Sequence, residues 1–166
     1  MDPKGRAFLV AGGYAAALRG WNDGNGERLY VGGSFTSAGG FPYLARWNPA
    51  TGTWSGLGSG ISGGFTNAFM TTLLPFNPGT GERLVAGGFF DTAGGVAQTA
   101  SLAMWNGTTW QSMGTGWTGT TRQSVWCMAT WNNRLYIGGG IVNTPALIAG
   151  QPWAGMASWD GSAWTP

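Results

Sequence analysis

Short apolar runs alternate with turns rich in Gly, Asn, Asp and Pro along the whole chain. The apolar positions do not recur at the i, i+3, i+4 spacing of an amphipathic helix, and short runs bounded by turn residues are typical of strands. The one alanine-rich run, at residues 15–18, aligns with strand-like runs elsewhere in the chain. The pattern therefore predicts an all-β fold.

One motif occurs three times. It reads Arg-Leu-Tyr-Val-Gly-Gly from residue 28, Arg-Leu-Val-Ala-Gly-Gly from residue 83 and Arg-Leu-Tyr-Ile-Gly-Gly from residue 134, so successive repeats are 55 and 51 residues long. The third copy is four residues shorter at the turn just before the motif, which is reduced to Asn132 and Asn133. A period near fifty built from strand-like runs indicates an array of small sheets, each packed on its neighbours.

A pair of tryptophans follows each motif. In the second and third repeats the pair encloses Asn-Gly or Asp-Gly, which is the strongest short-range signal of a β-hairpin, and in the first it encloses a longer loop. Each repeat thus predicts four strands: an inner apolar strand, the Arg-to-Gly-Gly strand, a strand ending at the first Trp and a strand beginning at the second. Four antiparallel strands per repeat describe a blade of a β-propeller.

The repeated glycines and tryptophans are expected to be structural. A Gly pair suits a place where a strand bends or another backbone approaches closely, and paired tryptophans suit the packing between adjacent blades. The chain has 32 Gly without a collagen period and only 8% charged residues, so it must bury or stack its aromatic side chains. The expected structural residues are Gly32, Gly33, Gly87, Gly88, Gly138, Gly139, Trp47, Trp54, Trp105, Trp110, Trp159 and Trp164.

The sequence resembles a known class of repeat. Leu-Tyr-Val-Gly-Gly-Ser-Phe-Thr-Ser-Ala-Gly-Gly at 29–40, Leu-Ala-Arg-Trp-Asn at 44–48 and Trp-Ser-Gly-Leu-Gly-Ser-Gly at 54–60 are similar to the blades of kelch-like propellers. Such blades occur in bacterial secreted and surface proteins and in the fungal cortical polarity-marker family. The resemblance covers residues 14–166 and implies an extracellular or cell-surface propeller, but no particular chemistry. The third repeat departs from it through an insertion at 143–152, a candidate specialised loop.

The repeats predict one propeller region over residues 1–166, with blades at about 13–60, 65–116 and 123–166 and an extra strand at 6–11. Closed propellers have about four to eight blades. Three readings stay open: a segment of a longer propeller protein, a chain that closes a ring with copies of itself, or an open arc in a larger assembly. Because end blades would expose apolar faces, self-association or packing on other propeller blades is expected.

The composition leaves little for catalysis. Without any His and with a single Cys, the chain lacks the commonest acid–base, metal and nucleophile arrangements, so neither catalytic residues, a metal nor a cofactor is expected. Cys127 lies in an apolar run and is expected to be a buried small hydrophobe. A net charge of +2 argues against nucleic acid, and no apolar stretch approaches the roughly 20 residues of a membrane helix.

Two further sets of residues carry expectations. Arg28, Arg83 and Arg134 share one repeat position and are expected to be structural, with guanidinium groups bonded to loop carbonyls or nearby glutamates; a binding ring of arginines is the alternative. The repeat does not explain three tryptophans, which are the candidate ligand-binding residues, although packing between blades is the competing role. They are Trp117, Trp126 and Trp153.

These observations predict a non-catalytic structural or protein-interaction module of a surface or secreted protein. One alternative is a lectin-like module that binds carbohydrate through aromatic side chains on its loops. The other is a fragment of a larger propeller enzyme whose active site lies elsewhere. The expected partners are other propeller blades, copies of the chain, or a glycan or protein ligand.

Overall fold

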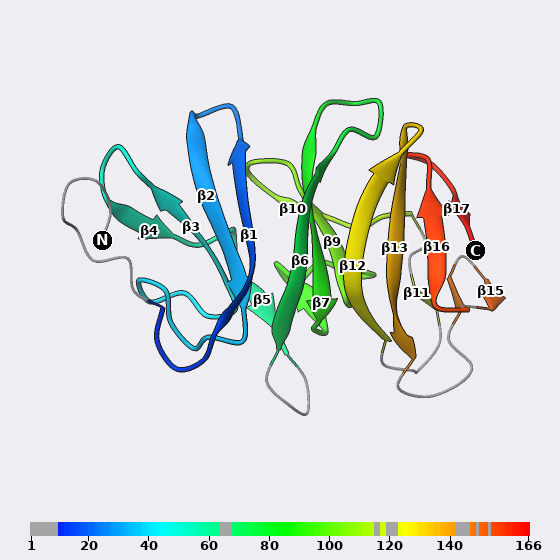
Figure 1. The fold of residues 1–166 in the computed structure, drawn as a ribbon, viewed down its shortest axis with the longest axis horizontal. Helices are drawn as coiled ribbons and strands as arrows, with labels where there is room; N and C mark the ends of the chain where they lie inside the picture. Colours follow the sequence, from blue (N-terminus) through cyan, green and yellow to red (C-terminus); the bar gives the residue numbers. More distant parts are fainter. Residues whose placement is uncertain are drawn as a thin grey trace.

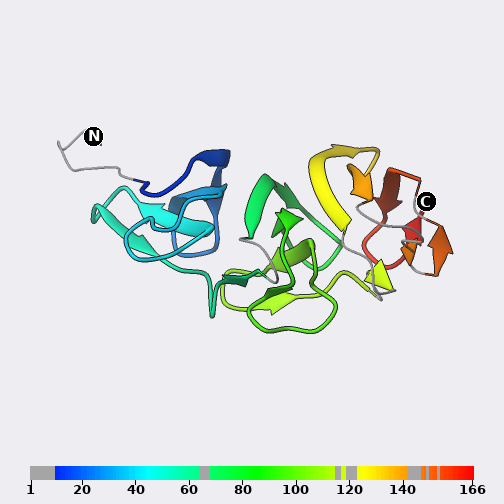
Figure 2. The same cartoon turned by 90° about the horizontal axis from the view of Figure 1, so that it is seen from below.

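The computed structural model describes residues 10–63, 68–114, 117–118, 123–141, 147–148, 150–152 and 154–166. Within these residues the chain is all-β, and three four-stranded antiparallel sheets stand side by side in chain order (Figure 1). Seen from below, the sheets form an arc and not a closed ring (Figure 2). The predicted fold class, an all-β fold of about three four-stranded antiparallel blades that form an incomplete ring or an arc, is confirmed, and we call the sheets the first, second and third blades.

Each blade follows the predicted order of strands, inner strand first. The first blade contains β1 (Ala15–Asn22), β2 (Glu27–Gly33), β3 (Leu44–Asn48) and β4 (Thr53–Ser55). The second contains β6 (Phe69–Phe76), β7 (Arg83–Phe89), β9 (Leu102–Trp105) and β10 (Trp110–Gln111). The third contains β12 (Gln123–Trp131), β13 (Arg134–Ile141), β16 (Met156–Trp159) and β17 (Trp164–Thr165).

Short strands just before the inner strand of the second and third repeats pair with short strands in the loop that follows the Gly pair of the same repeat. β5 (Ile61–Ser62) pairs with β8 (Thr92–Ala93), and β11 (Trp117–Thr118) pairs with β14 (Leu147–Ile148). β14 also pairs with β15 (Gln151–Pro152), so the described part of the predicted specialised loop is a hairpin. In the first repeat the counterpart is a single bridge between Ala11 and Ser37; of the extra strand expected at 6–11, residues 6–9 lie outside the described part.

The second glycine of each pair faces the backbone of its own inner strand. There the pairing register shifts by one residue, as between Met70 and Thr72 in the second blade. A Cβ on Gly88 would lie 2.2 Å from the carbonyl oxygen of Phe69, and the corresponding distances in the first and third blades are 2.0 and 1.9 Å. No side chain fits at this position, because backbone atoms cannot yield as a flexible side chain can.

In the first two blades, the first glycine of the pair receives a side chain from the following blade. A Cβ on Gly32 would lie 2.8 Å from the Cβ of Met70, and one on Gly87 would lie 2.9 Å from a methyl group of Val125. Met70 and Val125 hold the same position in the inner strands β6 and β12. The first glycine therefore sets how closely one blade approaches the next.

The apolar core lies between the blades rather than within them. Between the first and second blades, Trp21 and Tyr30 pack in one buried cluster with Trp105 and Trp110. Between the second and third blades, the corresponding cluster includes Phe76, whose ring centre is 5.8 Å from that of Trp159. A third cluster, formed by Val31, Phe35, Ala38 and Ala45, lies on the other side of the first blade.

A repeated hydrogen bond accompanies this packing. The indole N–H of Trp110 donates to the carbonyl oxygen of Leu57 at 2.9 Å, and that of Trp164 donates to the carbonyl oxygen of Met113 at 2.8 Å. Leu57 and Met113 lie on the segments that lead out of the preceding blades. The second Trp of a pair thus anchors its blade to the chain that enters it.

Replacing Gly88 by Ala should cost more than the roughly 3 kcal/mol at the upper end of ordinary overpacking, because its Cβ would overlap backbone. Gly20→Ala is the matched control: a Cβ there meets only the flexible carboxylate end of Glu27, at 3.0 Å. Alanine is also the better strand residue, so Gly20→Ala should be neutral or slightly stabilising. Urea unfolding of both variants measures the difference, and equal losses of stability would contradict this role for the second glycine.

Candidate functional site

The structure places the three predicted ligand-binding tryptophans differently. Trp126 lies in β12 and is 61% exposed, and its indole N–H donates to the Ser124 hydroxyl at 2.6 Å. The backbone of Trp117 forms β11 beside β14, but its side chain lies outside the described part of the chain. Trp153 lies wholly outside it. The backbone of Trp117 and the described part of the 143–152 insertion are thus neighbours, while Trp126 belongs to a blade face.

Trp131, at the end of β12, is the most exposed large apolar side chain of the described residues, at 69%. The same repeat position is occupied by Trp21 and Phe76, which are each only 5% exposed because the following blade covers them. The three residues align in the sequence repeats, and nothing in the neighbouring sequence distinguishes the exposed Trp131 from the buried Trp21 and Phe76. Its place in the third repeat was the only available signal.

Other positions of the third blade show the same change. Tyr136 is half-buried, whereas its counterpart Tyr30 is fully buried, and their rings lie 6.0 and 5.5 Å from Trp131 and Trp21 respectively. Met156 is 62% exposed, although the corresponding Leu residues of the other blades are buried. We call this uncovered surface the third-blade face, and it consists of Trp126, Cys127, Trp131, Tyr136 and Met156.

The prediction that Cys127 is buried is wrong: the residue is exposed. Its counterpart in the first blade, Ala17, is buried in the cluster shared with the second blade. Cys127 therefore occupies a position that a following blade would cover, and no described residue covers it. The apolar run in the sequence correctly indicated a position between blades, but it did not indicate whether another blade covers that position.

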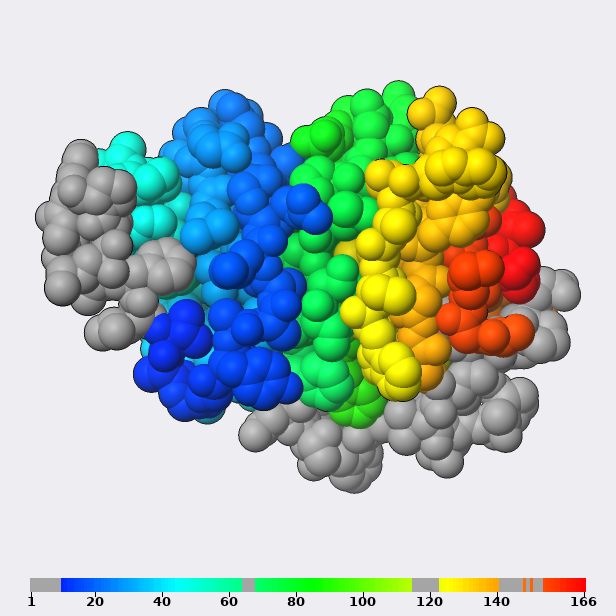
Figure 3. Space-filling view, viewed as in Figure 1, coloured from blue at the N-terminus to red at the C-terminus, as the bar shows by residue number. Residues whose placement is uncertain are grey.

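The first blade also has exposed apolar residues on the side directed away from the second blade, beside the buried cluster of Val31, Phe35, Ala38 and Ala45. Leu18 is 60% exposed, whereas its counterpart Leu73 is buried against the preceding blade. Ala15 is exposed where Met70 is buried, and Leu29 is only half-buried. Leu18, Ala15 and Leu29 define the first-blade face. The space-filling view shows the inner strands of the three blades side by side on one surface (Figure 3).

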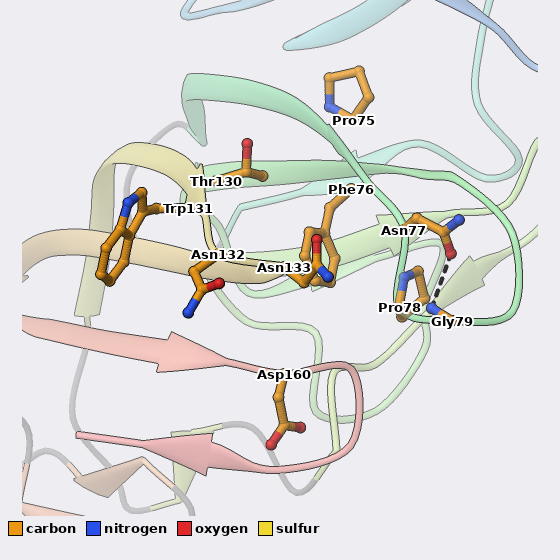
Figure 4. Close-up of a pocket in the computed structure, with 10 residues that line it drawn as sticks. All are labelled: Pro75, Phe76, Asn77, Pro78, Gly79, Thr130, Trp131, Asn132, Asn133 and Asp160. Atoms are coloured by element: carbon orange, nitrogen blue, oxygen red, sulfur yellow. Dashed lines mark hydrogen bonds between the residues drawn. The ribbon is translucent and has the colours of Figure 1, made fainter.

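A groove lies between the second and third blades at their turn ends (Figure 4). It has a volume of about 650 Å³. The four-residue deletion explains it, because the short turn at Asn132 and Asn133 reaches less far than the turn at 22–27. In the first contact, by contrast, the Glu82 carboxylate accepts a 2.7 Å hydrogen bond from Trp21. The lining residues are Pro75, Phe76, Asn77, Pro78, Gly79, Thr130, Trp131, Asn132, Asn133 and Asp160.

The repeated arginines have structural partners. Arg28 donates to the carbonyl oxygens of Asn25 and Glu27, and Arg83 makes the same two bonds within its own turn, as expected. Arg134 makes no such bond within its two-residue turn. It donates instead to side chains of its own blade, at 3.2 Å to Ser158, 2.9 Å to Thr165 and 3.5 Å to Asp160.

Asp160 shapes the hairpin that borders the groove. Its carboxylate accepts hydrogen bonds from the backbone N–H groups of Ala163 and Ser162, both at 2.8 Å, and from the Ser162 hydroxyl at 2.9 Å. These bonds favour the charged form and lower the pKa of Asp160 to about 2. Asn106 fills the same role in the second blade with its amide oxygen, at 2.9 and 2.8 Å from two backbone N–H groups.

A second carboxylate lies where the first and second blades meet. The Asp23 side chain is almost fully buried, pairs with Arg46 and accepts a 3.1 Å hydrogen bond from the Tyr30 hydroxyl. Burial raises the pKa of Tyr30 well above its usual range. Since both donors are directed at the same oxygen, Asp23 serves the packing of the blade and is held away from solvent.

In the described part of the chain no cluster of His, Cys, Asp and Glu is large enough to hold a metal ion. A search of the same residues finds no helix with the length and apolar character needed to cross a membrane. No protein family, curated protein or solved structure matches the chain.

Asp160→Asn should remove a component of acid sensitivity while keeping the hairpin, because Asn106 supports the same turn. The pKa of Asp160 is lower in the folded state than its ordinary value of 3.8, so its contribution is present above about pH 4 and is lost as pH falls through about 2. The melting temperatures of wild type and variant should therefore converge toward pH 2. Asp160→Ala, which lacks an acceptor, should be less stable at every pH; a constant gap between wild type and Asp160→Asn would contradict the assignment.

Proposed function

We propose that the chain is a non-catalytic structural or protein-interaction module made of kelch-like propeller blades, belonging to a surface or secreted protein. The observation that carries the proposal is the repeated contact between blades, together with the apolar side chains on the first and third blades that no described residue covers. Exposed apolar patches of this kind are characteristic of protein–protein contact sites. The kelch-like character and the extracellular location rest on the sequence resemblance.

The polar groups support the same proposal. The carboxylates of Asp23 and Asp160 are engaged by neighbouring side chains and backbone N–H groups, and the repeated arginines bind their own turns or blade. Groups held in this way stabilise local structure and are not poised for proton transfer or nucleophilic attack. The blades thus provide surfaces more readily than reactive groups.

A lectin-like function is the second candidate, and the groove between the second and third blades favours it. Its lining residues include Trp131, Asn77, Asn132, Asn133 and Asp160. Trp131, at the end of β12, and Asp160, in the turn between β16 and β17, both belong to the third blade (Figure 4). Aromatic, amide and carboxylate residues around one groove suit a sugar ring, which has apolar faces and a hydroxyl rim.

A saccharide array, followed by titration of intrinsic Trp fluorescence, separates the two functions. The structural proposal predicts no saccharide binding at the groove. If the groove binds sugar, Trp131→Ala or Asn133→Ala should abolish binding, whereas Trp126→Ala, which removes an exposed indole outside the groove, should leave it unchanged. Binding should also survive EDTA. Saccharide binding with this pattern of losses would replace the structural proposal by the lectin-like one.

A further inference from the structure

We propose that the third-blade face of one copy docks on the first-blade face of a second copy, so that two copies close a ring of six blades. The proposal rests on the proposed function as an interaction module and specifies its partner. The proposal follows from the two contacts between blades within the chain. These contacts show which residues cover the positions that correspond to the third-blade face and the first-blade face.

The internal contacts share one arrangement. The aromatic residue at the end of an inner strand packs with the first Trp of the next blade, as Trp21 does with Trp105 and Phe76 with Trp159. The turn beyond that aromatic residue meets the next Trp hairpin. A Cβ on Gly107 would lie 2.9 Å from the Asp23 carbonyl oxygen, and one on Gly161 would lie 2.5 Å from that of Pro78.

The third-blade face repeats the half of this contact that the following blade covers. Trp131 and Tyr136 reproduce the buried pair of Trp21 and Tyr30 in position and spacing. Gly138 corresponds to Gly32 and Gly87, which receive Met70 and Val125 from the following blade. Among the described residues, a Cβ on Gly138 would meet only Cys127 and the Gly155 carbonyl oxygen. The space beside Gly138 that would receive a side chain of a following blade, which we call the seat at Gly138, is therefore open.

The first-blade face supplies the matching half. Ala15 holds the position of Met70 and Val125 and is exposed, so it can enter the seat at Gly138. Leu18 and Leu29 hold the positions of Leu73 and Leu84, which are buried against the preceding blade. The chain makes this contact twice internally, between the first and second blades and between the second and third. The third-blade face and the first-blade face are the two halves of a further contact of the same kind.

The two halves differ, so their contact is head-to-tail. A heterologous contact closes when its rotation completes a ring, and otherwise grows into a filament. Two copies of the three described blades give six, within the range of about four to eight in closed propellers, and three copies would give nine, which exceeds it. A symmetric dimer through two third-blade faces would leave Leu18 exposed, and this difference makes the arrangement testable.

Sedimentation velocity and native mass spectrometry of the 17.3 kDa chain test the proposal. Wild type should have twice the monomer mass. Trp131→Glu and Leu18→Glu should each be folded monomers, because each loses one half of the contact. Their mixture should regain a two-copy species, since the intact first-blade face of the former fits the intact third-blade face of the latter. Gln111→Glu adds the same charge at an exposed outer-strand position and should remain a dimer.

A monomeric wild type would overturn the proposal, as would a Leu18→Glu variant that remains dimeric or a mixture that stays monomeric. Near-ultraviolet circular dichroism confirms that each variant is folded, and Leu18→Ala provides a milder version if the charged one is not. The saccharide experiment decides the proposed function separately. A chain that is monomeric and binds no sugar would contradict the proposed dimer but would leave the proposed structural function intact.

Discussion

Packing of an inner-strand aromatic residue on the tryptophan hairpin of the next blade is the interaction on which the rest of the structure depends. A four-stranded sheet has no interior, so its apolar residues are removed from water by a neighbouring sheet or, as for Val31 and Ala45, by a loop of the same blade. Full burial of one large apolar side chain contributes about 1.5–3 kcal/mol relative to exposure. Trp126, Trp131, Met156 and Leu18 remain 60–69% exposed, so they lack most of this stabilisation.

The glycine pair makes that packing geometrically feasible. Its second residue lets the inner strand shift register against the neighbouring strand without a clash, and its first residue lets the next inner strand approach to van der Waals distance. A side chain at the first glycine would push the next blade away and separate the aromatic ring from its tryptophan hairpin. The two glycines therefore have different roles, one within a blade and one between blades, although the sequence presents them as one motif.

Much of the fold was accessible from sequence because strands, hairpins and close approaches are encoded locally. The Gly pairs, the Asn-Gly and Asp-Gly turns and the tryptophan pairs located all three blades. Burial was less accessible, since it depends on what covers a position. Cys127 and Trp131 have the same local context as buried residues of the other repeats. Arg134 shows a related limit: the shorter turn was visible in the sequence, but its consequence, new bonds to Ser158 and Thr165, required the spatial arrangement.

The deletion that opens the groove also connects the two candidate functions, because Trp131 lies at the groove and on the third-blade face. A following blade would cover this indole as the second blade covers Trp21, and a sugar could then no longer stack on its exposed surface. The polar part of the groove, at Asn77 and Asp160, lies between the second and third blades and does not depend on a following blade. Assembly and saccharide binding through Trp131 therefore compete for one side chain. The more favourable of two free energies, that of burying Trp131 under a following blade or that of stacking a sugar on it, decides which occurs.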